Sequence, residues 1–127
     1  MKKADLETTE TFTPQFDDKG LIPCVTTSSR TGKVLMMAYM NQDSIALSLK
    51  TGEAHYYSRS RQEIWHKGAT SGDIQTITSM RTDCDQDCIW IEVTTAQQPE
   101  TACHTGAESC FYREIDLKTK DHKLKKQ

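Results

Sequence analysis

Hard and soft metal ligands alternate in one short stretch of this chain. Asp83, Asp85 and Asp87 are separated by Cys84 and Gln86. In an extended strand, residues two apart face the same side at a spacing of about 6.6 Å. Neighbouring carboxylates repel one another unless a cation neutralises them, and oxygen ligands suit Mg²⁺ or Ca²⁺. The stretch predicts a magnesium site if a bend or bridging waters bring the carboxylates together. Otherwise it is an acidic strand edge that discourages aggregation.

Two more cysteines with polar neighbours, Cys103 and Cys110, follow Cys84 along the chain. The absence of a C-x-x-C pair excludes a zinc ribbon or finger. Three thiolates without an obvious fourth protein ligand would leave a coordination position open. Catalytic zinc keeps such a position for water, whereas structural zinc does not. His104, beside Cys103, is a candidate for a fourth ligand or for a general acid or base.

The composition bounds the class of protein. The 127 residues fit one domain, and 35% apolar residues predict a modest core that association with a second copy would help. A net charge of -2 gives no argument for nucleic acid or an anionic membrane as partner. Neither a signal peptide nor a run of about 20 apolar residues is visible, so we expect a cytoplasmic location. Cysteines there are ligands or reactive thiols more often than disulfides.

A basic, glycine-bearing segment covers residues 59–72. Its glycines let the backbone approach a ligand, its hydroxyl and N–H groups can donate to phosphate oxygens, and its tryptophan offers a face for a base. Arg61 adds charge to the same segment. Taken alone, this pattern is equally typical of a basic surface loop. The candidates for substrate binding are Arg59, Trp65, Lys67, Thr70 and Ser71.

The apolar pattern predicts an α+β fold. We expect strands over residues 21–26, 34–40, 53–58, 74–80, 89–93 and 110–115, and one helix over 42–50 between Asn41 as N-cap and Gly52 as stop. Pro23 favours an edge position for the first strand, and the continuous apolar run 34–40 predicts burial on both faces. Since no βαβ alternation occurs, the expected architecture is mostly antiparallel β-sheet with short helices in a single domain.

Composition also suggests the domain limits. Residues 1–19 are polar and predict a loose lead-in that ends at a turn. Residues 20–116 would form the domain. Residues 117–127 carry five lysines and predict a basic, solvated and disordered tail.

Taken together, these motifs resemble those of the phosphoribosyl-AMP cyclohydrolase family of histidine biosynthesis. The resemblance runs from about Leu21 to Glu114. The motifs that carry it are Val34–Asn41, Thr51–Arg61, Trp65-x-Lys67-Gly68-x-Thr70-Ser71-Gly72, Asp83-Cys84-Asp85-x-Asp87, Ala102–Gly106 and Ser109–Phe111.

The resemblance implies hydrolytic opening of the adenine ring of 1-(5-phosphoribosyl)-AMP at the N1–C6 bond. It implies a homodimer whose zinc ligands come from both subunits. By position, Cys84, Cys103 and Cys110 would bind zinc, and Asp83, Asp85 and Asp87 would bind magnesium. The chain ends too soon for the pyrophosphohydrolase domain that some members carry, which implies a single activity.

Some roles rest on chemistry beyond the resemblance. We expect His104 to move the proton. Cys24 and Cys88 receive no ligand role, because free cysteines beside apolar strand residues are often small buried hydrophobes.

Two other classes of function remain to be distinguished from this one. A non-catalytic zinc-stabilised module would have a closed four-ligand site and no turnover. A thiol redox protein using Cys84 and Cys88 would form a disulfide on mild oxidation and need no metal.

Overall fold

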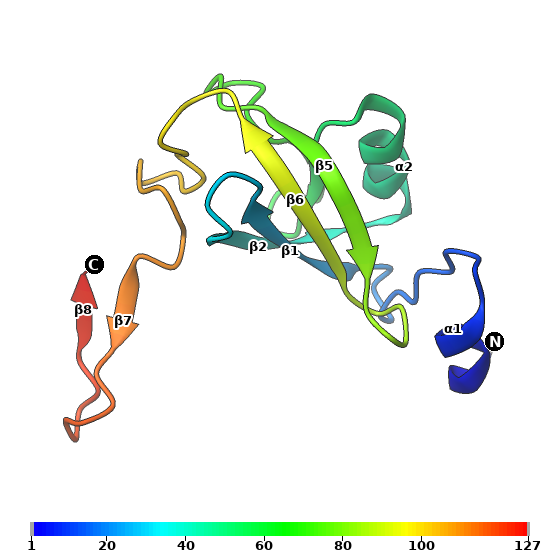
Figure 1. Ribbon diagram of the computed structural model, residues 1–127, viewed down its shortest axis with the longest axis horizontal. Coiled ribbons are helices and arrows are strands. Elements are labelled where there is room, and N and C mark those ends of the chain that lie inside the picture. Colours follow the sequence, from blue (N-terminus) through cyan, green and yellow to red (C-terminus); the bar gives the residue numbers. More distant parts are fainter. Residues whose placement is uncertain (1, 127) are drawn as a thin grey trace.

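Six strands form one mixed sheet in which two strands from distant parts of the sequence pair in the interior. The computed structural model describes residues 2–126. The sheet order is β4-β3-β2-β1-β6-β5. Its strands are β1 (Ile22–Ser28), β2 (Val34–Met40), β3 (His55–Ser58), β4 (Glu63–His66), β5 (Gln75–Thr82) and β6 (Ile89–Thr95). Figure 1 shows the long β5–β6 pair: β5 runs down to a turn at the bottom of the view, and β6 runs back up to the loops at the top.

Every neighbouring pair is antiparallel except β1 and β6, which run parallel. The expected single, mostly β domain is therefore present, but its sheet is mixed. The prediction of an edge position for the first strand was wrong, because β1 lies between β2 and β6. Pro23 fits there because it pairs only with Tyr39 of β2. The pairing with β6 begins one residue later, at Cys24, so the missing N–H costs no bond on that side.

Two short helices accompany the sheet. Helix α2 (Gln42–Thr51) begins at Asn41, whose side chain accepts a hydrogen bond from the Ser44 amide, while the Ser44 hydroxyl accepts one from the Asn41 amide. It ends at Gly52, which takes the left-handed conformation, and it packs against β2, β3 and β4. Both ends agree with the sequence prediction. Helix α1 (Lys3–Thr8) was not expected; it lies in the segment predicted to be a loose lead-in.

The core lies between the sheet and α2. Its fully buried members include Ile22, Leu35, Met40, Tyr56, Ile89 and Ile91. Cys24 is buried there, and burial raises the pKa of its thiol to about 12. The thiol therefore stays neutral, as expected for a cysteine that packs as a small hydrophobic residue. The continuous apolar run 34–40 is not buried throughout, because Val34 and Met37 are 44% and 45% exposed, whereas Leu35, Met36 and Met40 are buried.

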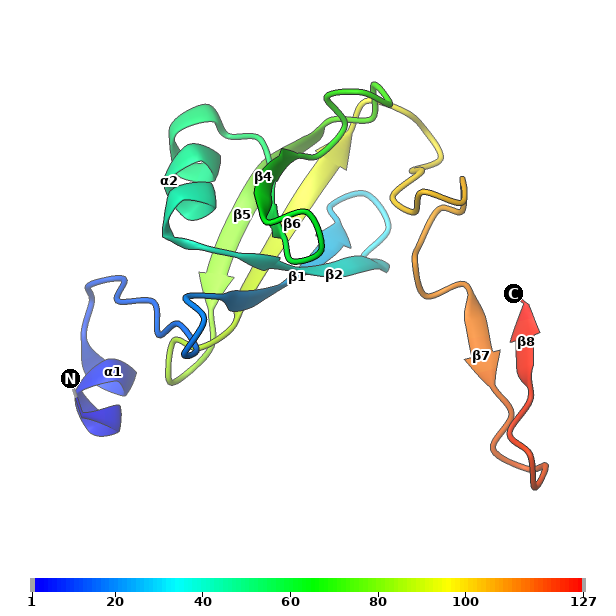
Figure 2. The same cartoon turned by 180° about the vertical axis from the view of Figure 1, so that it is seen from behind.

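The basic tail forms a hairpin instead of a disordered end. Strands β7 (Arg113–Ile115) and β8 (Leu124–Lys126) pair in antiparallel fashion. In both views the hairpin stands clear of the six-stranded sheet, at the opposite side from α1 (Figures 1 and 2). All six strand residues are exposed. No helix of residues 2–126 combines the length and the apolar character needed to cross a membrane.

Candidate active site

The three aspartates lie on the turn between β5 and β6 and not on a strand. The turn closes through hydrogen bonds from the Asp83 amide to the Cys88 carbonyl (3.1 Å) and from the Gln86 amide to the Asp83 carbonyl (3.1 Å). The Asp83 carboxylate also accepts from the amides of Asp87 (3.0 Å) and Cys88 (3.1 Å). This is the bend that the spacing required. It brings one carboxylate oxygen of each aspartate within 4.8 Å of the others.

The electrostatics of this turn favour a bound cation. Hydrogen bonding to Asp85 and then Asp83, with a smaller contribution from their charges, raises the pKa of Asp87 to about 6. A carboxyl group holds its proton in this way when neighbouring carboxylates resist a further negative charge. A divalent cation would relieve the same repulsion. The donor set, three carboxylates with room for water, fits Mg²⁺.

The loop between β6 and β7, which we call the cysteine loop, presents two of the predicted zinc ligands, Cys103 and Cys110, together. The Gly106 amide donates to the Cys103 carbonyl (2.9 Å), and the Cys103 amide donates to the Ala107 carbonyl (3.2 Å). The Cys110 amide donates to the Leu35 carbonyl of β2 (2.7 Å), which ties the far end of this loop to the sheet. The chain therefore turns back on itself, and the two thiols lie close enough to shift each other's pKa.

The two thiols differ in their readiness to ionise. Burial alone would raise the pKa of Cys103, but hydrogen bonds from Thr105, the neighbouring Cys110 thiol and the positive charge of Lys67 outweigh burial, so this pKa is lowered. The Thr105 hydroxyl donates to the Cys103 sulfur over 3.1 Å. Burial, then the charge of Cys103, raises the pKa of Cys110 to about 11. One thiol is thus prepared to become a thiolate, and a bound cation would be needed to ionise the second.

Lys67 and Asp73 bind the segment that leads into the cysteine loop. The Lys67 side chain is buried, and its ammonium donates to the Ala102 carbonyl over 2.6 Å. Burial lowers the pKa of Lys67, while the nearby thiols of Cys110 and Cys103 and the Asp73 carboxylate oppose that shift. Asp73 is 1% exposed and accepts from the Gln97 amide (2.9 Å) and from the Thr101 amide (2.9 Å) and hydroxyl (2.7 Å). These contacts hold the chain segment that precedes Cys103 in place.

Next to the thiols lies a cavity of about 460 Å³, which we call the basic pocket. Its lining comes from the turn between β3 and β4, from β4, from the loop after β4 and from the cysteine loop. No aspartate or glutamate lines it, so its charge is positive. The lining residues are Arg61, Trp65, His66, Lys67, Gly68, Thr70, Ser71, Thr101, Cys103, His104 and Gly106. Four of the five predicted substrate-binding residues, the predicted proton carrier and one predicted zinc ligand therefore meet in one place.

Some assignments come out differently. Arg59 does not line the basic pocket; its guanidinium lies 4.3 Å from the centre of the Tyr39 ring. Arg61, valued only for its charge, does line it. His66 also lines it and was missed. Its ring donates to the Glu53 carboxylate (2.8 Å) and stacks on the ring of His55. No sequence pattern marks that stack, because it depends on the pairing of β3 with β4.

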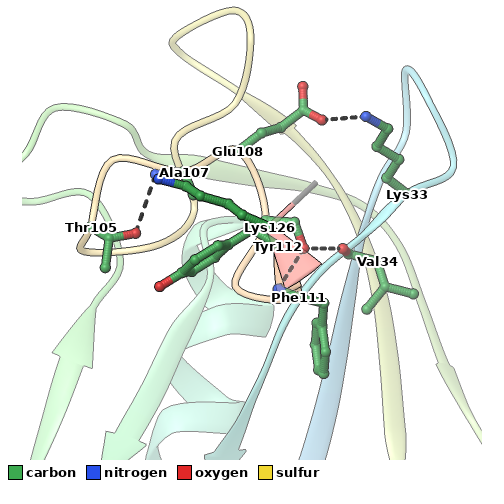
Figure 3. A pocket seen from close by; sticks show the side chains of 9 residues that line it. Lys33, Val34, Thr105, Ala107, Glu108, Phe111, Tyr112 and Lys126 are labelled. Atoms are coloured by element: carbon green, nitrogen blue, oxygen red, sulfur yellow. Dashed lines mark hydrogen bonds and ion pairs between the residues drawn. The ribbon is translucent and has the colours of Figure 1, made fainter. Parts of the chain in front are cut away.

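A larger cavity, of about 650 Å³, lies on the other side of the cysteine loop (Figure 3). It is bounded by the start of β2, the loop and the end of β8, and Figure 3 shows the Lys33–Glu108 ion pair (2.7 Å) at its rim. None of the predicted site residues lines it. The chemistry therefore points to the basic pocket as the site of reaction despite its smaller volume.

Cys84 lies far from the other two predicted zinc ligands. It is exposed on the β5–β6 turn, at the opposite end of β6 from the cysteine loop (Figure 1). The 7 residues of β6 alone span about 20 Å, whereas zinc binds sulfur at about 2.3 Å. Among residues 2–126, the only three metal-ligating side chains whose atoms meet are the aspartates of the turn. A site that uses all three thiols cannot form within one subunit of this shape.

Comparison with known proteins agrees with the chemistry of these residues. A family model described as phosphoribosyl-AMP cyclohydrolase matches residues 36–112. The curated phosphoribosyl-AMP cyclohydrolase of Rhizobium rhizogenes is 54% identical over 115 residues, which cover 91% of this chain and 76% of the relative. The enzymes of Sinorhizobium medicae and Agrobacterium fabrum are 52% and 51% identical, over 96% and 94% of this chain and 80% and 79% of theirs.

The match includes the basic pocket, the aspartate turn and the cysteine loop, and the identity extends over nearly the whole chain. The chain therefore belongs to the phosphoribosyl-AMP cyclohydrolase family, hydrolases of histidine biosynthesis.

Proposed function

We propose that this enzyme opens the adenine ring of 1-(5-phosphoribosyl)-AMP at the N1–C6 bond, using zinc and magnesium. The product is the formimino-type phosphoribosyl aminoimidazole carboxamide ribonucleotide. The observation that carries this proposal is the arrangement of the thiols. Cys103 and Cys110 lie together beside the basic pocket, and Cys84 lies at the other end of β6.

The separation of the thiols supports a homodimer with zinc ligands from both subunits. Cys84 is exposed, and so is Cys110, so each end of the sheet presents a ligand to a second copy. Two copies related by a two-fold axis would place Cys84 of each subunit against the cysteine loop of the other. Such a dimer would hold two equivalent sites, each formed from three thiolates and one open position.

Zinc in that position would supply Lewis acidity and lower the pKa of a water molecule for attack on carbon. The pocket residues bind the nucleotide and transfer protons. The ribosyl group on N1 makes the purine ring cationic and C6 electrophilic. Water adds to C6, the C6–N1 bond breaks, and C6 becomes the carboxamide carbon. His104, exposed at the mouth of the basic pocket, takes a proton from the water and returns one to the departing N1.

The remaining pocket side chains bind and orient the nucleotide. Trp65 lines the pocket and is 39% exposed, so its ring can stack on a base. Thr70 and Ser71 offer hydroxyl donors to phosphate oxygens, and Arg61 and Lys67 supply positive charge. The Lys67 ammonium, held by the Ala102 carbonyl, also stabilises the Cys103 thiolate beside it. Magnesium on Asp83, Asp85 and Asp87 would neutralise substrate phosphate.

Subunit complementation tests the shared site. Cys84→Ser and Cys103→Ser are each expected to be inactive alone, because each damages both sites of a homodimer. When the two variants are co-expressed, half of the dimers are mixed, and each mixed dimer holds one intact site. Turnover should therefore return to roughly a quarter of the wild-type value. Ring opening is followed by ultraviolet absorbance and zinc content by atomic absorption.

Cys88→Ser provides the matched control, because Cys88 lies on the same turn as Cys84 and has no ligand role. This variant should turn over substrate on its own. If the co-expressed pair stays inactive although mixed dimers are isolated, the sharing of zinc between subunits is wrong. Activity in Cys103→Ser alone would remove the thiolates from the mechanism altogether.

A further inference from the structure

Gln86 occupies an unusual position in the aspartate turn. It lies between Asp85 and Asp87, its backbone has a φ of +59°, and its side chain is 4% exposed. A left-handed backbone favours glycine, asparagine or aspartate and costs free energy in other residues. Gln86 is also the only buried residue of the turn 83–88. Something outside the turn must therefore hold this residue in place.

The holding contacts come from the N-terminal segment 6–15, which we call the N-terminal strap. The Gln86 side-chain oxygen accepts from the Thr13 amide over 2.6 Å. Its side-chain nitrogen donates to the Leu6 carbonyl over 3.1 Å and to the Thr11 carbonyl over 3.4 Å. Its backbone carbonyl accepts from the Gln15 amide over 2.7 Å. One glutamine thus binds four points along the strap.

The strap is anchored and reaches the metal ligands. The Leu6 side chain of α1 is 8% exposed, and its backbone carbonyl accepts from the Gln86 side chain. Strap and turn together enclose a cavity of about 350 Å³, lined on one side by Glu7 and Glu10 and on the other by Asp83 and Cys84. Composition predicted a loose lead-in here. The segment instead lines a cavity together with Asp83, a predicted magnesium ligand, and Cys84, a predicted zinc ligand.

We propose that Gln86 is a positioning residue through which the N-terminal strap holds the aspartate turn in its metal-binding shape. The inference rests on the proposed magnesium role of Asp83, Asp85 and Asp87. The bonds fix the peptide between two of these ligands in the left-handed conformation that lets the turn close. Without the side chain, the turn can relax, and the three carboxylates lose their common focus. Cation binding would then have to order the turn, and the conformational entropy lost in ordering it would weaken the binding.

Direct binding of Mn²⁺ tests this, since Mn²⁺ takes the same oxygen ligands as Mg²⁺ and is detected by electron paramagnetic resonance. The full chain is first loaded with zinc. Gln86→Gly keeps the left-handed backbone but removes the side chain, and Gln86→Asn keeps both the backbone preference and the amide but is too short for all of the contacts. Both are expected to bind Mn²⁺ about 10- to 100-fold more weakly, the usual effect of losing a group that orients a ligand.

Gln62→Gly is the matched control. Gln62 also has a left-handed backbone, with a φ of +54°, but it is exposed on the turn between β3 and β4. This substitution should leave Mn²⁺ affinity unchanged. Amide hydrogen exchange gives a second readout: the amides of Thr13 and Gln15, which donate to Gln86, should exchange faster in Gln86→Gly and not in Gln62→Gly.

The outcomes separate this inference from the function on which it rests. Measurements are made where circular dichroism shows each variant folded, and Gln86→Asn serves if Gln86→Gly does not fold. If Asp85→Asn loses Mn²⁺ binding but neither Gln86 variant does, the positioning role is wrong and the magnesium role stands. If Asp85→Asn binds Mn²⁺ as the wild type does, the magnesium role fails and this inference fails with it. A faster exchange of the strap amides without weaker binding also overturns the positioning role.

Discussion

At the scale of single residues, the surroundings of each cysteine decide what it can do. Cys24 is enclosed by core side chains, and burial holds the pKa of its thiol near 12, so it stays neutral. Cys103 has Thr105 and Lys67 beside it, and its pKa is lowered. Neighbours in the sequence already separated these two, because Cys24 follows apolar residues and Cys103 precedes His104. The sequence did not show that Lys67 lies beside Cys103 and helps to lower its pKa.

His104 carries the first prediction at this scale. Replacing His104 by alanine is expected to lower kcat on the order of 10²- to 10⁴-fold, the usual contribution of a general acid or base, with zinc content unchanged. The control is His122→Ala, since His122 lies in the β7–β8 turn and is also exposed. Steady-state kinetics with zinc analysis on the same samples decides the matter. A near-normal kcat in the His104 variant would assign the proton transfer to another group.

The residues that sequence reasoning missed have a common physical reason. Asp73 is an isolated carboxylate without a motif, and only the folded chain shows that it is 1% exposed and binds the backbone at Gln97 and Thr101. Arg59 and Arg61 look equivalent in sequence. They are two residues apart, yet one lies on Tyr39 and the other lines the basic pocket. Side-chain direction at a strand end is set by the following turn, which residue type alone does not specify.

At the scale of elements, the helix and most of the strands were predictable, and connections were the weak point. Asn41 and Gly52 mark the ends of α2 by capping chemistry that is local in sequence. The aspartates were harder. Alternation over residues 83–87 is compatible with a strand, and only the left-handed Gln86 reveals a turn. Strand β4 was also missed, because polar residues of the segment 59–72 conceal a strand that pairs with β3.

Gly68 gives a prediction at this scale. Its φ is +88°, and an added Cβ would overlap the main-chain atoms of Asp73 and Ile74. Gly68→Ala should therefore destabilise the fold by about 3 kcal/mol or more, from the left-handed backbone and overpacking together. Gly32 has a φ of +78° with open space around it, so Gly32→Ala should cost only the backbone part, about 1–2 kcal/mol. Urea unfolding measures both, and equal costs would show that the close approach at Gly68 is not a constraint.

At the scale of the whole molecule, the sequence could not reveal how the two halves of the sheet join. Strand order follows from long-range pairing, and no local pattern shows that β1 and β6 are neighbours. The thiols are a different case, because the resemblance already implied zinc ligands from both subunits. The length of β6 adds a physical reason, since it keeps Cys84 away from Cys103 and Cys110 within one subunit. The expected tail became a hairpin because Ile115 and Leu124 pair across it.

The proposed zinc site, shared between two subunits, would link metal binding to association. Removal of zinc by a strong chelator is expected to lower Tm and to shift the dimer towards monomers, and added zinc should restore both. Thermal scans and sedimentation velocity at several protein concentrations measure these effects. Cys103→Ser serves as the control, because it lacks the site and should respond little to the chelator. An intact dimer with unchanged Tm after verified zinc removal would argue for an interface that does not depend on the metal.

The parallel contact at the heart of the sheet also governs the order in which the chain can assemble. Its first residue pair joins Cys24 to Ile89, so β1 leaves the ribosome long before its partner exists. Until residue 95 has been made and released, one side of β1 has unpaired backbone groups, and the apolar side chains of β6 are missing from the interior. Early folding is thus confined to the meander of β1 to β4 with α2. During synthesis, an open strand edge is available to chaperones or to other nascent chains.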